Sequence, residues 1–168
     1  LRQVKKTTGQ DEIVLVTKRG QSIRFKEKEI REMGRQAAGN RGIRLKKGDE
    51  LVGMEIIKNL ALASQKLEKK YLLIVTKNGY GKRTDLKEYR LQGRGGSGIK
   101  TAKVIEKTGD IISSKILEGP EEDLIVISQK GQVIRIKLSQ IPKLGRATQG
   151  VRIMRLEEGD RVASVTYI

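Results

Sequence analysis

The chain contains no cysteine and no histidine, and these two absences remove most of the familiar catalytic and metal-binding chemistry. Thiolate nucleophiles, Ser-His-Asp triads and zinc sites built from Cys or His are excluded. Without cysteine there is no disulfide from which to infer the redox compartment. The sequence therefore predicts no catalytic residue, no metal site and no cofactor.

Aromatic residues make up only 3% of the 168 residues, too few for a platform on which single-stranded bases stack. Long apolar runs are also missing: no stretch approaches the ~18 residues that cross a bilayer, and the amino terminus lacks the core of a signal peptide. We therefore expect a cytoplasmic protein without a membrane partner. The apolar share of 36% is enough to fill the core of one domain or two small ones.

What the chain has in excess is positive charge. Its 36 Lys and Arg residues face 20 Asp and Glu residues, which gives a net charge of +16. Such an excess points to a polyanionic partner, with nucleic acid as the first candidate. The excess is largest over residues 70–117 and smallest over 118–168, so we expect the middle of the chain to dominate the electrostatic field.

Three segments of the chain repeat one pattern. Each begins with an apolar run that ends in a turn glycine, from Ile13 to Gly20, from Leu72 to Gly79 and from Leu124 to Gly131. Each later reaches a Gly-Asp pair that is followed by another apolar stretch. Repeats of this length have the size of a propeller blade.

Two arginines recur in every repeat at fixed distances from the turn glycine. The first, which we call the strand arginine, is Arg24, Arg83 or Arg135. The second, which we call the frame arginine because it lies in a Gly-Arg-x-x-x-Gly frame, is Arg35, Arg94 or Arg146. Equivalent cations repeated along one rim suit a phosphate backbone better than a compact ligand.

The local patterns predict an all-β fold with about four short strands in each repeat. A continuous apolar run such as Leu124 to Ile127 predicts a strand buried on both faces, and the turn glycine supplies the positive φ of a tight hairpin. The second strand is expected over Ser22 to Lys26, Gly81 to Leu86 or Val133 to Lys137.

Alternation in the second strand of the third repeat indicates one wet and one dry face. Val133 and Arg135 fall on the wet face, so the strand arginines should project outward. Two more strands are expected in this repeat, near Val151 to Leu156 and Arg161 to Thr166, joined across the Gly-Asp turn.

We place the blade repeats at residues 11–58, 70–117 and 118–168. Residues 1–10 are expected to be the remnant of a preceding element. Residues 59–69 are expected to be a charged linker, with a short helix as the alternative.

Two segments of the middle repeat resemble the carboxy-terminal domain of DNA gyrase A. They are Asn78 to Thr84 and a glycine-rich segment similar to that family's box motif Gln-Arg-Arg-Gly-Gly-Lys-Gly. The box segment here is Gln92, Gly93, Arg94, Gly95, Gly96, Ser97 and Gly98. The segments Met33 to Leu45 and Gly145 to Val151 resemble later blades of the same domain. The related subunit of topoisomerase IV is the nearest competitor.

The resemblance implies a β-pinwheel, a propeller-like disc of about six blades that exchange strands with their neighbours. The order of the repeats resembles the last three blades, so we expect this chain to be part of a larger disc. The resemblance also implies a non-catalytic module whose basic rim bends and wraps duplex DNA. The resemblance implies the gyrase cleavage core and gyrase B as partners, together with which the module supports ATP-dependent supercoiling. The expected location is the nucleoid in the bacterial cytoplasm.

The candidate phosphate contacts are the strand and frame arginines together with basic residues of the middle repeat. The full set is Arg24, Arg35, Lys82, Arg83, Arg90, Arg94, Lys100, Arg135 and Arg146. The glycines of the box can form a tight connection between blades and can also let the DNA backbone approach Arg94. A nucleotide-binding loop is disfavoured, because neither a helix nor a Lys-Ser/Thr pair follows.

Two other classes of function stay open at this point. An RNA-binding β-module would carry a similar charge, although it would not predict three copies in register. In a protein-interaction propeller, the rim would bind a partner protein and the charge would mainly aid solubility.

Overall fold

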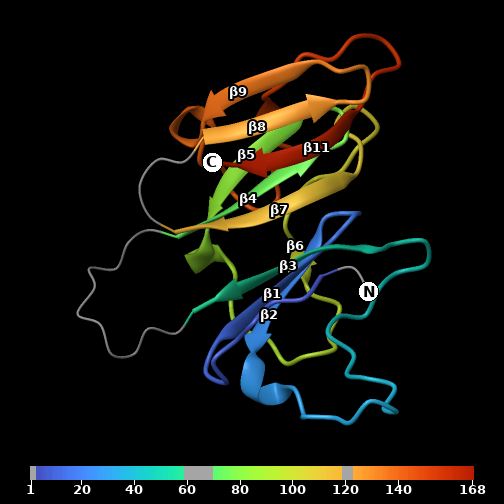
Figure 1. The fold of residues 1–168 in the computed structure, drawn as a ribbon, viewed down its shortest axis with the longest axis vertical. Helices are drawn as coiled ribbons and strands as arrows, with labels where there is room; N and C mark the ends of the chain where they lie inside the picture. Colours follow the sequence, from blue (N-terminus) through green and yellow to red (C-terminus); the bar gives the residue numbers. More distant parts are fainter. Residues whose placement is uncertain (1–2, 59–69, 119–122) are drawn as a thin grey trace.

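The computed structural model describes residues 3–58, 70–118 and 123–168. The described chain is all-β, as predicted, and its strands form three antiparallel sheets that follow one another along the longest axis (Figure 1). The predicted linker over residues 59–69 lies outside the described residues.

The first repeat forms strands β1 (Glu12–Thr17), β2 (Gln21–Lys26) and β3 (Leu51–Ile57). They stand in the order β3-β1-β2, and the free edge of β2 pairs with β6 (Ile99–Lys100), a strand of the second repeat. The first sheet therefore takes its outer strand from the next repeat along the chain.

The second sheet is built in the same way. The second repeat supplies β4 (Tyr71–Thr76), β5 (Tyr80–Asp85) and β7 (Ile111–Leu117), and β10 (Val151–Arg152) comes from the third repeat to pair with β5. The strand order is β10-β5-β4-β7. The blades thus exchange strands, as the resemblance implied.

The third sheet contains β8 (Asp123–Ser128), β9 (Val133–Lys137) and β11 (Val162–Tyr167), in the order β11-β8-β9. The prediction of about four strands in each repeat holds for the second and third repeats but is wrong for the first, which forms three strands among the described residues. The third sheet nevertheless has three described strands, although its repeat forms four. The reason is the exchange itself, since the third repeat gives its short strand β10 to the second sheet. That strand is also shorter than the predicted Val151 to Leu156.

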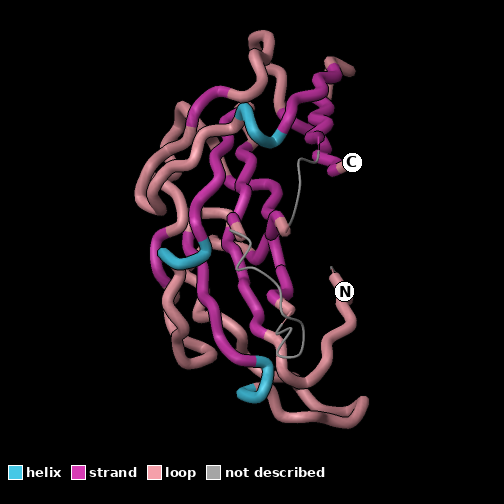
Figure 2. The backbone as a smooth tube through the Cα atoms, turned by 90° about the vertical axis from the view of Figure 1, so that its left-hand side faces the viewer, coloured by secondary structure: helices cyan, strands magenta, loops and turns pink. Residues whose placement is uncertain are grey.

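Each hairpin turns at the glycine that the sequence singled out. Gly20, Gly79 and Gly131 have φ angles of 86°, 76° and 85°, in the left-handed region that favours glycine. After the second strand of each repeat comes a single turn of 3-10 helix: η1 (Glu27–Glu29), η2 (Leu86–Glu88) or η3 (Leu138–Gln140) (Figure 2). No helix in the described part of the chain is long and apolar enough to cross a membrane.

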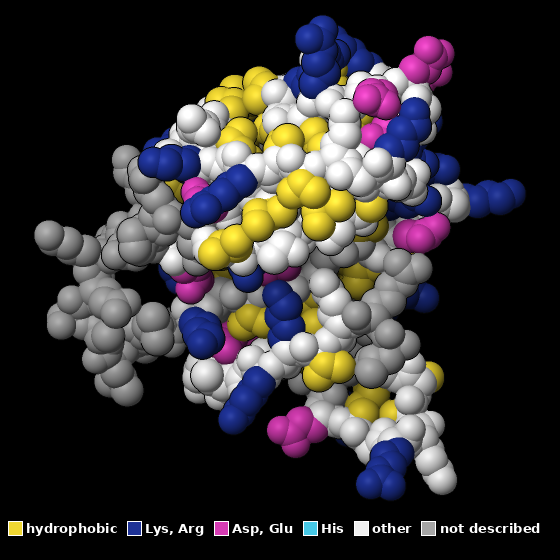
Figure 3. Space-filling view, turned by 45° about the horizontal axis from the view of Figure 1, so that its top comes forward, with side chains coloured by type: hydrophobic (Ala, Val, Ile, Leu, Met, Phe, Trp, Pro, Cys, Tyr) yellow, Lys and Arg dark blue, Asp and Glu magenta, His cyan; other side chains and the backbone are white. Residues whose placement is uncertain are grey.

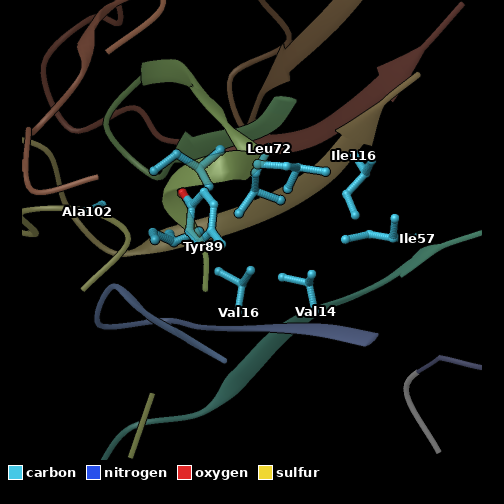
Figure 4. Packing of buried hydrophobic residues seen from close by; sticks show 10 residues of the cluster. Val14, Val16, Ile57, Leu72, Tyr89, Ala102 and Ile116 are labelled. Carbon is cyan, nitrogen blue, oxygen red and sulfur yellow. The ribbon is translucent and has the colours of Figure 1, made fainter. Parts of the chain in front are cut away.

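The core lies between neighbouring sheets. Val14 and Val16 point from β1 towards Leu72, Tyr89 and Ile116 of the second blade, and all five side chains are buried (Figure 4). A similar cluster joins the second blade to the third. Each buried aliphatic side chain contributes about 1.5–3 kcal/mol relative to an exposed one, so packing between blades is the main source of stability.

The predicted burial of the first strand on both faces holds for β4, all of whose residues are buried. It is wrong for β8, in which buried and half-buried residues alternate and Ile125 and Ile127 are half-buried. The difference arises because the third sheet packs on the second with one face only, and no described sheet covers the other face.

The inner and outer sides of the molecule follow from the strand orders. Strands β3 and β7 contact each other, and a Cβ placed on Gly53 of β3 would lie 1.9 Å from Oγ of Ser114 in β7. This close approach marks the inner side, where the blades converge. The exchanged strands β6 and β10 stand at the opposite edge of their sheets, which we call the outer edge.

Candidate nucleic-acid interface

The box segment Gln92 to Gly98 runs along the outer edge of the first blade. The N–H of Gln92 donates to the carbonyl of Arg24 at 2.8 Å, and the N–H of Gly95 donates to the carbonyl of Gly42 at 2.8 Å. Gly98 has a φ of 71°, and a Cβ there would lie 2.4 Å from the carbonyl oxygen of Ser22. The box is thus a tight connection between blades.

The remaining box residues lie closer to solvent. Gly93, Gly96 and Ser97 are exposed, whereas Gln92 and Gly95 are half-buried. The backbone of the box is therefore open to an approaching ligand on one side and hydrogen-bonded to the first blade on the other.

The frame arginines Arg94 and Arg146 each bond to the repeat before their own. Arg94 Nη1 donates to the carbonyl of Arg41 at 2.7 Å, and Nε donates to the carbonyl of Glu29 at 2.9 Å. Arg146 Nη1 donates to the carbonyl of Lys100, the counterpart of Arg41, at 2.9 Å. Both guanidinium groups therefore connect neighbouring blades.

The strand arginines Arg24 and Arg83 bond in the other direction, to the repeat after their own. Arg24 Nη1 donates to the carbonyls of Leu86 and Tyr89 at 3.1 and 3.0 Å, at the ends of η2. Arg83 donates from Nε to the carbonyl of Ile141 at 2.7 Å, and from Nη2 to that of Ser139 at 2.9 Å, around η3.

These hydrogen bonds determine where the strand arginines point. The predicted outward projection is wrong for Arg24 and Arg83, which are half-buried because their guanidinium groups lie against the next blade. We refer to Arg24, Arg83, Arg94 and Arg146 as the blade-spanning arginines. Sequence reasoning could not identify their carbonyl partners, since these lie 53 to 65 residues away for Arg24 and Arg94.

Arg135 and Arg35 are the terminal members of the two sets, and they are exposed. The side chain of Arg135 is 69% exposed and makes an ion pair with Asp123, with Nε 2.6 Å from Oδ2. Arg35 has no hydrogen-bond partner among the described residues. Both would need a further blade to make the contacts that their counterparts make.

The prediction that Lys82 contacts a phosphate is wrong for this arrangement, because its side chain is 0% exposed. Nζ donates to the carbonyls of Gly145 and Arg146 at 2.6 and 2.7 Å and to Oγ1 of Thr148 at 3.1 Å. Burial is the main reason that the pKa of this ammonium falls from 10.5 to about 8, while Glu88 opposes the shift and Arg146 adds to it. Lys82 holds the frame of the third repeat.

Arg90 and Lys100 complete the predicted set, and both are exposed. Exposed cations that the sequence did not single out lie on or beside the outer strands as well: Arg41, Arg44, Lys103, Arg152 and Arg155. Lys and Arg side chains are spread around the outline of the molecule in Figure 3. The outer edge can therefore attract an extended polyanion. Among the described residues, no cluster of acidic side chains is suited to a metal ion.

A family described as "DNA gyrase C-terminal domain, beta-propeller" matches three segments of the chain, residues 11–58, 70–117 and 122–168. The chain belongs to this family. The resemblance read from the box and its neighbouring segments is thereby confirmed, and so is the β-pinwheel fold class.

Relatives and solved structures agree with this assignment to the DNA gyrase C-terminal domain family. The DNA gyrase A protein of Staphylococcus epidermidis (strain ATCC 12228 / FDA PCI 1200) is 44% identical over 165 residues, which are 98% of this chain and 18% of that protein. The chain thus spans less than a fifth of the length of this curated relative.

Two solved structures share the fold. The C-terminal domain of DNA topoisomerase IV has a TM-score of 0.81 and 25% identity, with coverage of 95% of this chain and 47% of that one. The DNA gyrase A C-terminal domain has a TM-score of 0.56 and 19% identity, with coverage of 98% and 68%.

Proposed function

We propose that this chain is a non-catalytic module that binds and bends duplex DNA as part of DNA gyrase A. The observation that carries the proposal is the outer edge, where exposed Lys and Arg recur from blade to blade in a chain of net charge +16. Family membership and 44% identity to a DNA gyrase A protein support the same function.

The binding mechanism follows from charge and rigidity. Exposed cations neutralise phosphates and release condensed counterions, which supplies affinity without reading the sequence. The blade-spanning arginines fix the spacing of the blades, and the blades converge on the inner side. The exposed cations on the outer edge therefore follow a curved path. Duplex DNA that contacts successive blades bends along that path, and the contacts offset the elastic cost.

Within a larger enzyme, the module has a clear task. By wrapping a DNA segment with a fixed hand, it would present that segment to a cleavage core for strand passage. The proposed partners are duplex DNA, the gyrase cleavage core and gyrase B, and the proposed setting is the bacterial cytoplasm at the nucleoid. ATP hydrolysis and DNA cleavage belong to those partners, and this chain contributes no catalytic group.

Salt-dependent DNA binding tests the proposal. The affinity for several unrelated duplexes is measured by fluorescence anisotropy at a series of salt concentrations, with a duplex RNA of equal length as the comparison. We expect binding in the micromolar range or tighter at low salt, a steep loss as salt rises, and little difference between DNA sequences. Salt-insensitive binding, a strong preference for one sequence or a preference for RNA would overturn the proposal.

Membership of a topoisomerase IV enzyme is the second candidate, because the solved topoisomerase IV domain superposes with the higher TM-score, 0.81 against 0.56. The test that separates them is whether the chain wraps DNA with a fixed hand, which is the task proposed above. Relaxed circular DNA that is closed in the presence of the chain changes its linking number if DNA wraps with a fixed hand. A module that only bends DNA leaves the linking number unchanged, and this outcome would favour the second candidate.

A further inference from the structure

Two basic positions recur in every repeat just after the last glycine of the frame, which is Gly39, Gly98 or Gly150. The position two residues after this glycine forms what we call the first row, namely Arg41, Lys100 and Arg152. The position five residues after it forms the second row, namely Arg44, Lys103 and Arg155. Both rows are basic in all three repeats.

All six side chains of the rows are exposed. No ion pair with an acidic residue involves any of them in the described part of the chain. Arg152 makes the one ring contact of the set, with Cζ 5.8 Å from the centre of the Tyr80 ring. The rows thus differ from the blade-spanning arginines, whose guanidinium groups bond to backbone carbonyls.

The backbone that carries the rows is fixed at the outer edge. Between the two rows each repeat buries the residue four positions after the frame glycine: Ile43, Ala102 or Met154, with exposures of 8%, 3% and 2%. The N–H of Arg44 donates to the carbonyl of Gly96 at 2.8 Å, and the N–H of Lys103 donates to that of Thr148 at 3.0 Å. The cations are therefore attached to an ordered backbone and repeat with the spacing of the blades.

We propose that the two rows are the principal phosphate contacts of this chain and that the blade-spanning arginines act on DNA only by holding the blades in place. The inference rests on the proposed DNA-binding function and deepens it by assigning the residues. Exposed cations without acidic partners keep their full attraction for phosphate, whereas a guanidinium bonded to carbonyls must first give up those bonds.

The test compares two variants that lose the same charge. The row variant replaces Arg44, Lys103 and Arg155 by Gln. The control variant replaces Lys46, Lys47 and Lys107 by Gln, three exposed lysines that precede the Gly-Asp turns. Both variants remove three positive charges from exposed positions, so a general effect of net charge would weaken DNA binding equally in both.

We expect the row variant to bind duplex DNA at least about tenfold more weakly at constant salt. Its salt dependence should flatten by about 0.9 in slope for each phosphate that the variant no longer neutralises. The control variant should lose much less affinity and keep the slope. A variant in which Arg41 and Lys100 of the first row become Gln gives a second, independent comparison. Thermal unfolding confirms that every variant is folded.

Each outcome has one meaning. If row and control variants lose affinity and slope equally, the rows are not the principal contacts, and the inference is overturned while DNA binding stands. If the unaltered chain does not bind duplex DNA in a salt-dependent way, the proposed function is overturned, and the inference that rests on it falls as well. A selective loss in the row variants supports the assignment.

Discussion

Lys82 is buried at the position that holds isoleucine in the other repeats, Ile23 in the first and Ile134 in the third. The ammonium keeps three hydrogen bonds to the frame of the next repeat, but it loses its hydration. Since burial lowers its pKa to about 8, the folded chain binds this proton less tightly than the unfolded chain does. The charged form therefore lowers stability at neutral pH.

The first prediction concerns this pH dependence. The unfolded chain keeps the Lys82 proton up to a pH of about 10.5, whereas the folded chain loses it near 8, so stability should rise with pH between these values. Relative to Lys82→Met, the free energy of unfolding of the unaltered chain should increase by on the order of 2 to 3 kcal/mol across this window. Urea unfolding at a series of pH values measures it.

Lys87→Met in the same repeat is the control, because Lys87 is exposed. Removal of this exposed charge should change the free energy of unfolding by less than about 0.5 kcal/mol. A difference between the unaltered chain and Lys82→Met that stays constant or shrinks as the pH rises would show that the ammonium is not desolvated in solution.

The second prediction compares two strand arginines. Arg24 bonds to the carbonyls of Leu86 and Tyr89, whereas Arg135 is 69% exposed and pairs with Asp123. Lysine cannot reproduce the planar set of donors, so Arg24→Lys should lower the free energy of unfolding by about 2 kcal/mol. Arg135→Lys should change it by less than about 0.5 kcal/mol, because exposed ion pairs contribute little. Chemical denaturation of both variants measures these free energies. Equal losses of stability in the two variants would contradict the role of Arg24 in connecting the blades.

The exchanged outer strands depend on a glycine that closes each frame. Gly98 has a φ of 71° and a Cβ there would lie 2.4 Å from the carbonyl oxygen of Ser22, whereas Gly39, with a φ of 87°, has no atom near its Cβ position within 4 Å. Alanine at either position strains the backbone by about 1 kcal/mol. Only at Gly98 does it also push the outer strand off its neighbour.

The third prediction follows from this pair. Gly98→Ala should destabilise the chain by about 2 kcal/mol more than Gly39→Ala, because it disrupts the pairing of β6 with β2 in addition to the backbone strain. Thermal unfolding gives the stabilities, and hydrogen exchange of the amides in β2 reports on the pairing. The same loss in both variants would mean that strain alone matters and that the outer strand tolerates a methyl group.

The strands of this fold could be predicted well from the sequence, because the strands of a hairpin depend on local patterns of apolar residues and turn glycines. The turn glycines and apolar runs located the first two strands of every repeat within one or two residues. The exchange of β6 and β10 could be inferred only from the family, since a strand of two residues carries no periodic signal.

The hydrogen-bond partners of the arginines could not be predicted from local sequence patterns either. Exchange places each frame against the neighbouring blade, so the carbonyl that receives a guanidinium depends on three-dimensional packing. Two signals in the sequence could have helped: the alignment of Lys82 with Ile23 and Ile134 indicates burial, and the basic residues after Gly39, Gly98 and Gly150 recur in register.

At the scale of the whole molecule, the two terminal blades present complementary surfaces. In the third blade, the outer edge of β9 pairs with no described strand, Val133 is 62% exposed, and Arg135 lacks the carbonyl contacts of Arg24. In the first blade, Arg35 is exposed and the segment that corresponds to β6, residues 40–41, forms no strand. An unpaired strand edge is a site for pairing with another chain.

The fourth prediction is that two copies of this chain associate head to tail, with residues 40–41 of one copy pairing with β9 of the other. Such an assembly would lengthen the basic outer edge available to DNA. The mass in solution, measured by sedimentation velocity, should rise with concentration. Val133→Lys should abolish the association, because a charge on the edge opposes pairing. Leu91→Lys, which changes a residue 44% exposed between the first two blades, should leave it intact. A constant monomer mass, or equal effects of both variants, would contradict this pairing.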